Sequence, residues 1–168
     1  MIKMRTKNEI EIPEGLNVSL DGSTIIVSGP KGKVSNILPS AVKLEGKKII
    51  LAQASKEMMN TSFALINSSF KGVQEGYKRK MKMIFAHFPM TVEVKGKIIH
   101  IKNFLGEKMP RVAKIVGDTQ IKPEKEFVTI SGPDKHEVGQ TIANIKTATR
   151  IKNKDPRTFQ DGLYEVND

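Results

Sequence analysis

The sequence predicts an α+β fold of two tandem duplicated domains, each an antiparallel β-sheet packed against one α-helix. Three observations lead to this prediction. Short runs of alternating apolar residues are separated by glycine turns in both halves of the chain, each half carries one helical apolar stripe, and the halves align with each other. We therefore expect domains at residues 1–80 and 81–168, the second ending in a basic tail.

Two hairpins are predicted in the first half. Alternating apolar residues flank Asp21-Gly22 within residues 17–29, and the same pattern flanks Glu45-Gly46 within residues 42–52. Gly at the second position of such a pair suits the positive φ of a tight turn between antiparallel strands. Both segments are therefore interpreted as β-hairpins.

Residues 55–73 predict the first helix, because apolar residues recur there at spacings of four and three. Ser55 is a candidate N-cap, and Gly72 is a candidate end of the helix. The inner stripe is predicted to contain Met59, Phe63, Ile66, Phe70 and Val73.

The second half repeats this order of elements. A half-buried strand is predicted in residues 77–88, a hairpin in 91–103 and further strands in 111–117 and 125–132. A helix follows in residues 134–151. In the first strand the alternating apolar residues are Met81, Met83 and Phe85, and the helix is predicted to bury Val138, Ile142, Ile145 and Thr149.

The two halves align at nearly constant offsets, which predicts a duplication. Gly22 aligns with Gly96 (96 − 22 = 74), and the helices align through Phe63 and Ile142 (142 − 63 = 79). The difference of five residues fits a longer loop in the second copy, around residues 105–110. The alternative is a chance resemblance between two segments that are both rich in hairpins.

The charge balance predicts a polyanionic partner. The 168 residues include 28 Lys and Arg against 18 Asp and Glu, which gives a net charge of +10 and a pI near 9.7. Nucleic acid is the first candidate and an anionic membrane surface the second. Because no apolar run approaches the roughly 18 residues of a spanning helix, and no apolar signal core follows the N-terminus, we expect a soluble cytoplasmic protein.

Enzyme chemistry is not indicated. The stretch "SGPDKHEVG" at 131–139 lacks the glycine spacing and the Gly-Lys-Ser/Thr ending of a phosphate-binding loop. His87, His100 and His136 are far apart in the sequence, no pair of carboxylates stands out, and the absence of cysteine excludes thiolate ligands and disulfides. We expect no catalysis, no cofactor, no metal and no small-molecule substrate.

Two common RNA-binding motifs are also not indicated. "GPKG" at 29–32 has the GxxG pattern of a KH domain, but here it joins two strands instead of two helices. Aromatic residues make up only 5% of the chain, and no strand carries the ring cluster that an RRM requires. Base stacking is therefore not expected as the main mode of binding.

Cations concentrate late in the chain, which favours contacts with several phosphates. The candidate binding residues of this segment are Lys146, Arg150, Lys152, Asn153, Lys154 and Arg157. Lys146 and Arg150 are expected on one helical face. The alternative is a solvated helix end, where cations also complement the helix dipole.

The start of the second helix is a further candidate contact. Asp134 and Glu137 predict a capping pair, and Lys135 and His136 extend from the positive end of the helix. A capped helix start without any ligand explains the same residues.

Residues 131–164 resemble the C-terminal signature of the universal large-subunit ribosomal protein number six in its archaeal and eukaryotic form. The most specific part is Arg157-x-Phe159-x-Asp161-Gly162-x-Tyr164, and residues 27–35 and 64–81 are also similar to that family. The resemblance covers essentially the whole chain. Because bacterial members end differently, it points to an archaeal protein.

The resemblance implies a ribosomal protein with duplicated domains and no catalytic activity. It implies binding to large-subunit (23S-type) rRNA, mainly through the second domain, near the sarcin–ricin loop and the stalk base where translation factors dock. Neighbouring large-subunit proteins at the stalk base are the implied protein partners. Residues 62–73 lack the arginine common at this place in bacterial relatives, so RNA contacts of the first domain are not inferred. The alternative is a basic protein-interaction module outside the ribosome.

Overall fold

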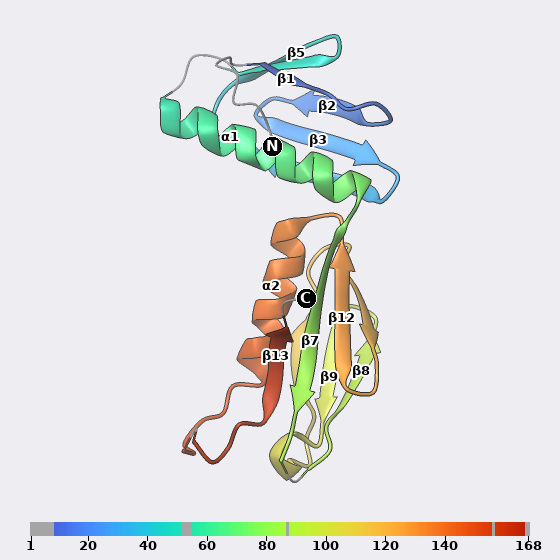
Figure 1. Cartoon of the computed structure of the whole chain (residues 1–168), viewed down its shortest axis with the longest axis vertical. Helices are drawn as coiled ribbons and strands as arrows, with labels where there is room; N and C mark the ends of the chain where they lie inside the picture. Colours follow the sequence, from blue (N-terminus) through green and yellow to red (C-terminus); the bar gives the residue numbers. More distant parts are fainter. Residues whose placement is uncertain (1–8, 52–54, 87, 156, 167–168) are drawn as a thin grey trace. The chain divides into compact units, whose positions relative to one another are not determined.

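The structure, a computed structural model, describes residues 9–51, 55–86, 88–155 and 157–166. The chain divides into two compact units, Met1–Gly76 and Tyr77–Asp168 (Figure 1). The sequence placed this division after residue 80. Residues 77–80 lie with the second unit instead, because a strand that pairs only within that unit begins at Tyr77.

The strands of the first unit form two three-stranded antiparallel sheets. Their orders are β1-β6-β5 and β2-β3-β4. The two predicted hairpins are confirmed, with Gly22 and Gly46 both at φ 60° in their turns. The strands are β1 (Glu9–Glu11), β2 (Asn17–Asp21), β3 (Thr24–Gly29), β4 (Gly32–Ile37), β5 (Val42–Glu45) and β6 (Lys48–Leu51).

Helix α1 (Lys56–Gln74) covers the core of the first unit, and its N-cap is Ser55 as predicted. Gly72 does not end the helix: it lies buried inside it, and Gly76, at φ 80°, follows the last turn. Phe63 is 39% exposed and does not join the buried stripe. Small polar residues replace it, and the buried positions are Ser62, Ile66, Ser69, Phe70, Gly72 and Val73.

The second unit contains a three-stranded sheet of order β10-β9-β8 and a four-stranded sheet of order β11-β12-β7-β13. The hairpin β8/β9 is confirmed, with Gly96 at φ 59°. The strands are β7 (Tyr77–Ile84), β8 (Thr91–Lys95), β9 (Ile98–Lys102), β10 (Arg111–Lys114), β11 (Gln120–Pro123), β12 (Phe127–Gly132) and β13 (Gly162–Val166). A short 3-10 turn, η1 (Phe104–Gly106), follows β9.

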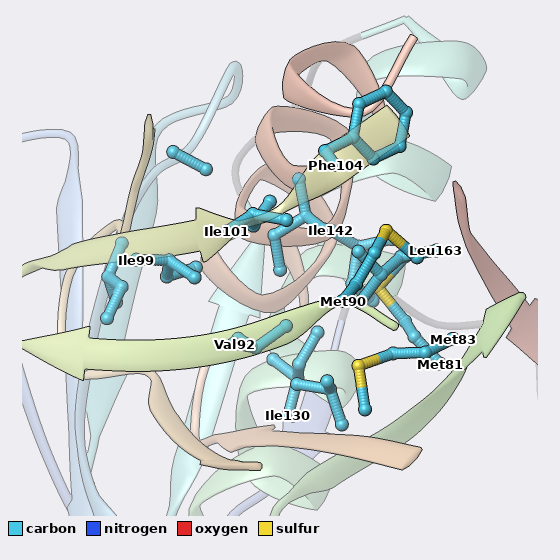
Figure 2. Packing of buried hydrophobic residues seen from close by; sticks show 14 of the residues in the cluster. Met81, Met83, Met90, Val92, Ile99, Ile101, Phe104, Ile130, Ile142 and Leu163 are labelled. Atoms are coloured by element: carbon cyan, nitrogen blue, oxygen red, sulfur yellow. The ribbon is translucent and has the colours of Figure 1, made fainter. Parts of the chain in front are cut away.

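Helix α2 (Lys135–Ala148) packs against β7, β10, β12 and β13, and Val138, Ile142 and Ile145 are buried as predicted. These side chains meet Met81 and Met83 of β7 in one core (Figure 2). Phe85, predicted in the same alternation, is 42% exposed because β7 ends at Ile84. Burial of this apolar surface is the main stabilising term of the unit.

The fold class is confirmed as α+β with a repeated order of elements. Among the described residues, each unit contains six strands followed by one helix. The helix N-caps Ser55 and Asp134 are 79 residues apart, which is the offset of the helix alignment. Strand β13 has no counterpart in the described part of the first unit. It is formed by residues 162–166 of the expected basic tail, which pair antiparallel with β7.

Candidate nucleic-acid interface

Three loops meet at one end of the second unit, and we call the surface formed by their described residues the three-loop end: residues 85–86 and 88–90, 103–110, and 149–155 and 157–161. The Asn103 side-chain amide donates to the carbonyl of Pro89 at 3.1 Å. The backbone N–H of Ala86 donates to Oδ1 of the buried Asp161 at 3.2 Å. These bonds join the first loop to the second and to the third.

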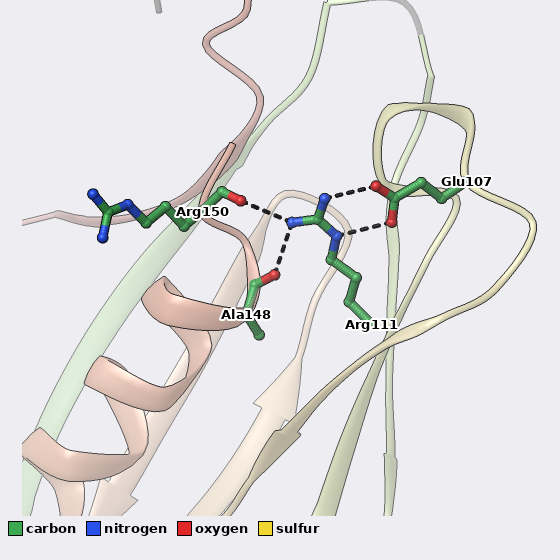
Figure 3. Close-up of polar contacts among 4 residues, drawn as sticks. All are labelled: Glu107, Arg111, Ala148 and Arg150. Carbon is green, nitrogen blue, oxygen red and sulfur yellow. Dashed lines mark hydrogen bonds and ion pairs between the residues drawn. The ribbon is translucent and has the colours of Figure 1, made fainter. Parts of the chain in front are cut away.

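Arg111, the first residue of β10, joins the second loop to the third (Figure 3). Its Nε and Nη2 donate to the two carboxylate oxygens of Glu107 at 2.8 and 2.6 Å. Its Nη1 donates to the carbonyls of Ala148 and Arg150 at 3.0 and 2.9 Å. The guanidinium also lies 4.2 Å from the ring centre of the buried Phe104. One side chain thereby holds the end of α2 and the start of the basic segment in place.

The loops contain backbone conformations that are uncommon outside glycine. Asn103, Leu105 and Asn153 have φ values of 57°, 51° and 58°. Gly106, at φ 76°, has the ring of Phe88 against its α-carbon, where a Cβ would lie 3.3 Å from the ring. Positive φ at non-glycine residues costs free energy and is concentrated at functional sites. The conformation of this end is thus imposed by its tertiary contacts.

The third loop carries most of the predicted binding residues, and these are all exposed: the cations Arg150, Lys152, Lys154 and Arg157, and the neutral Asn153. The Arg150 side chain points away from Arg111, although its carbonyl binds Arg111 (Figure 3). Lys154 Nζ lies 4.5 Å from the ring centre of Phe159. Arg157 approaches Asp155 at 3.8 Å, with 93% of its side chain exposed, so this ion pair contributes little.

Lys146 lies apart from these residues. Its Nζ binds Glu165 of β13 at 3.1 Å, and Arg79 of β7 binds the same carboxylate at 3.4 Å. The expectation that Lys146 and Arg150 share one helical face is wrong, because α2 ends at Ala148 and Arg150 belongs to the following loop. The Arg111 contacts stabilise this end of the helix in place of another turn.

Lys135 and His136 are exposed at the opposite end of α2, which spans about 20 Å for 14 residues. The structure does not bring them together with the third loop. Asp134 caps this end by accepting from the backbone N–H of His136 at 2.8 Å. The predicted capping pair is not formed: Glu137 instead packs over Gly117 and accepts from the N–H of Asp118 at 3.1 Å.

Several exposed residues of the three-loop end were missed by the sequence analysis. Met109 is 80% exposed, and Lys108 is exposed beside it without an ion pair to a described residue. Phe85 and Phe88 are 42% and 47% exposed in the first loop. The signal for Lys108 and Met109 was present as the five extra residues of the second repeat, which the alignment treated as a loop without a role.

The acids of the three-loop end are engaged by its own residues. The hydrogen bond from Arg111 lowers the pKa of Glu107, partial burial opposes this shift, and the charges of Arg111 and Lys154 assist it. Asp161 is buried with its carboxylate bound to Ala86, and Asp155 accepts from the N–H of Arg157 at 2.9 Å. The exposed charge of this end is therefore dominated by cations.

In the described parts of the chain, His, Asp and Glu residues do not gather into a group that would hold a metal ion. His100 lies in β9, His136 is exposed at α2, and His87 is outside the described residues. Neither described helix is long and apolar enough to span a membrane.

Known proteins resemble this chain over almost its whole length. A family described as Ribosomal protein L6 matches residues 88–162. The chain is 45% identical over 165 residues to the large ribosomal subunit protein uL6 of Methanosarcina mazei, with 94% of each covered. It is 41% identical over 169 residues to uL6 of Methanobrevibacter smithii, and this alignment covers 96% of the chain and 95% of that protein. It is 42% identical over 175 residues to uL6 of Thermoplasma acidophilum, with 99% and 98% covered.

Proposed function

The chain belongs to the ribosomal protein L6 family in its archaeal form, and on this premise we propose that it binds large-subunit rRNA through the three-loop end of its second unit. Its membership makes it a structural component of the large ribosomal subunit in the cytoplasm, and not an enzyme. Its partners are rRNA and other proteins of that subunit.

The observation that carries the proposal is the excess of exposed cations at the three-loop end. Lys108, Arg150, Lys152 and Lys154 form no ion pair with described residues, and Arg157 has only a distant one. Each can neutralise a phosphate and release a counterion from the RNA. Contacts of this kind recognise the shape of folded RNA through phosphates and 2′-hydroxyl groups, with little reading of bases.

Arg111 makes this surface suitable for phosphates. The C-terminal end of a helix carries partial negative charge, which repels phosphate groups. Arg111 donates to the carbonyls of Ala148 and Arg150 and thereby compensates that charge. The Arg150 side chain remains directed away from this cluster and is free to meet RNA.

The finer location is part of the proposal. By resemblance to the family, the rRNA contacted lies near the sarcin–ricin loop and the stalk base, and the protein supports the region where translation factors bind. Neighbouring proteins at the stalk base are the expected protein contacts. We keep three further residues as predicted rRNA contacts: Lys135, His136 and Lys146. We rank them below the residues of the third loop because they lie elsewhere on the second unit.

The salt dependence of binding tests the role of the third loop. We compare the full chain with the variant Lys152→Gln/Lys154→Gln/Arg157→Gln, using an rRNA fragment that contains the sarcin–ricin loop. The slope of log affinity against log salt should fall in magnitude by about 2 to 3 in the variant. A matched control is Lys31→Gln/Lys33→Gln/Lys43→Gln, which removes the same charge from exposed positions of the first unit.

The comparison of the two variants distinguishes RNA binding at the three-loop end from nonspecific attraction by the net positive charge of the chain. An unchanged slope in the third-loop variant, or an equal loss in the control, would overturn the assignment to the three-loop end. Chemical footprinting of large-subunit rRNA with and without the chain tests the location. Protection should cluster near the factor-binding region, and protection confined to other regions would reject that location.

A further inference from the structure

One face of the four-stranded sheet β11-β12-β7-β13 is not covered by α2. The helix packs on the face that presents Met81, Met83 and Leu163, which are buried in the core (Figure 2). Because successive side chains of a strand point to opposite faces, the residues between them point away from the helix. We call this second surface the outer sheet face.

Three residues form a row across the outer sheet face. Lys82 of β7 is paired in register with Phe127 of β12 on one side and with Tyr164 of β13 on the other. The Lys82 Nζ lies 6.0 Å from the ring centre of Phe127. Two aromatic rings from different strands thus flank one lysine.

The ring of Tyr164 lies close to a glycine of its own strand. A Cβ on Gly162, two residues earlier in β13, would lie 3.1 Å from Cε2 and 3.4 Å from Cζ of this ring. The Cε2–Cζ edge of the ring therefore lies against the glycine, while the residue remains 47% exposed. Covering of an edge glycine by a tyrosine stabilises a strand by itself. The exposed part of the ring is accessible for stacking.

Three lysines of the outer sheet face have no acidic partner among the described residues. Lys78, Lys82 and Lys122 point from it, are exposed, and form no ion pair with described residues. Register places no acidic residue among the described strand residues that share this face. Support of a glycine explains the ring of Tyr164, but it does not explain why three lysines of β7 and β11 on the same face have no ion pair with a described residue.

We propose that the outer sheet face binds a single-stranded segment of RNA, with one base stacked on Tyr164, the adjoining phosphate paired with Lys82 and more distant phosphates of the segment paired with Lys78 and Lys122. The proposal rests on the proposed function, in that the RNA is the same large-subunit rRNA. An unpaired base is required because only an unstacked base exposes its face to a protein ring. A protein partner is disfavoured because lysine is depleted at protein interfaces.

Intrinsic fluorescence can test the stacking directly, because the chain has two tyrosines and no tryptophan. In the variant Tyr77→Phe, Tyr164 is the single tyrosine of the full chain. An unstructured RNA of about 12 nucleotides, within the range of site sizes for single-strand binders, should quench this emission in a saturable way. Absence of quenching at RNA concentrations that saturate binding overturns the stacking.

Affinity for the same RNA, measured by the anisotropy of an end-labelled probe, tests the residues. Tyr164→Leu should weaken binding by about tenfold, whereas Tyr164→Phe keeps the ring and should bind nearly as wild type. Phe63→Leu, a change of an exposed aromatic residue on α1, is the matched control and should have no effect. Equal binding by Tyr164→Leu and wild type overturns the proposal.

The design separates this proposal from that of the three-loop end. If Tyr164→Leu binds the single strand as wild type does, while the third-loop variant no longer binds the rRNA fragment, the proposal for the outer sheet face is wrong and the proposed function stands. If the third-loop variant still binds the rRNA fragment as wild type does and Tyr164→Leu no longer binds the single strand, the assignment to the three-loop end fails and the outer sheet face stands. If Tyr164→Leu binds both RNAs normally but is lost from large subunits, a protein neighbour occupies this face and the RNA assignment is overturned.

Discussion

The guanidinium of Arg111 binds both carboxylate oxygens of Glu107, at 2.8 and 2.6 Å, and also donates to the backbone carbonyls of Ala148, the last residue of α2, and of Arg150 in the following loop. Four hydrogen bonds from one side chain therefore connect a strand, a loop and a helix end. The planar fork of arginine allows this combination, whereas the single ammonium group of lysine does not match it.

Replacement of Arg111 should loosen the three-loop end. We expect Arg111→Ala to lower the free energy of unfolding by about 1–3 kcal/mol, because it leaves the carbonyls of Ala148 and Arg150 without this donor. Arg111→Lys should recover only part of this loss and should bind the rRNA fragment more weakly than wild type. Urea unfolding measures the stability of each variant, and binding to the rRNA fragment measures its affinity. Lys114→Ala, an exposed cation on the same strand, should change stability by less than about 0.5 kcal/mol. Wild-type values for Arg111→Lys in both assays would contradict the role of the fork.

The stability of the second unit should depend on pH through Glu107. The hydrogen bond from Arg111 holds the pKa of Glu107 below its ordinary value of 4.5 in the folded state. The resulting stabilisation is complete above the unfolded pKa and is lost as the pH falls through the lower folded pKa. We expect the difference in unfolding free energy between wild type and Glu107→Gln to be constant near neutral pH and to shrink below 4.5. A difference that does not change on acidification would show that the carboxylate charge plays no part.

Ser40 and Ser62 form a buried pair in the first unit, 4% and 0% exposed, with their hydroxyl oxygens 2.7 Å apart. Changing one serine to alanine leaves the other hydroxyl buried and unpaired, which should cost about 1–3 kcal/mol. The double variant should cost less than the sum of the single ones. A double-mutant cycle by urea unfolding measures this coupling. Ser19→Ala, at an exposed position of β2, is the control. Additive single effects would show that the two hydroxyls do not interact.

Gly29, the last residue of β3, allows the close approach of α1. A Cβ at this position would collide with Val73 and lie 2.6 Å from Cδ2 of Leu16. Gly29→Ala should therefore destabilise the protein by about 1–3 kcal/mol, and less in a Val73→Ala background. Gly139→Ala makes the same change at an exposed position of α2 with open space around it, and should stabilise by about 0.5–1 kcal/mol. Thermal unfolding of Gly29→Ala, Val73→Ala, their double variant and Gly139→Ala measures these changes in stability. Equal effects of the two glycine changes would refute the packing explanation.

Features set by a few neighbouring residues were predicted from the sequence. The turns at Gly22 and Gly96 and the caps at Ser55 and Asp134 lie where local rules placed them. The helix ends were less accurate. Glycine in a helix costs only about 1 kcal/mol, so packing of α1 overrides Gly72 and the helix continues to Gln74.

The candidate site was predicted only where its residues are close in sequence. Lys152, Lys154 and Arg157 stand together in the chain and in the structure. Arg111 gave no signal, because its partners Ala148 and Arg150 are 37 and 39 residues away. Likewise the sequence alone indicated no ring cluster on any strand, whereas pairing of three strands brings Phe127 and Tyr164 to either side of Lys82.

The sequence by itself determined the repeated order of strands and helix, most of the apolar positions that form the core, and the cationic character of the segment after α2. These follow from periodicity, turn chemistry and charge, which act over a few residues. Only the tertiary structure decided that β13 pairs with β7, that Arg111 holds the end of α2, and which lysines share a face with aromatic rings. The reason is that register and side-chain contacts between distant residues depend on how the strands and the helix pack together, which no local pattern encodes.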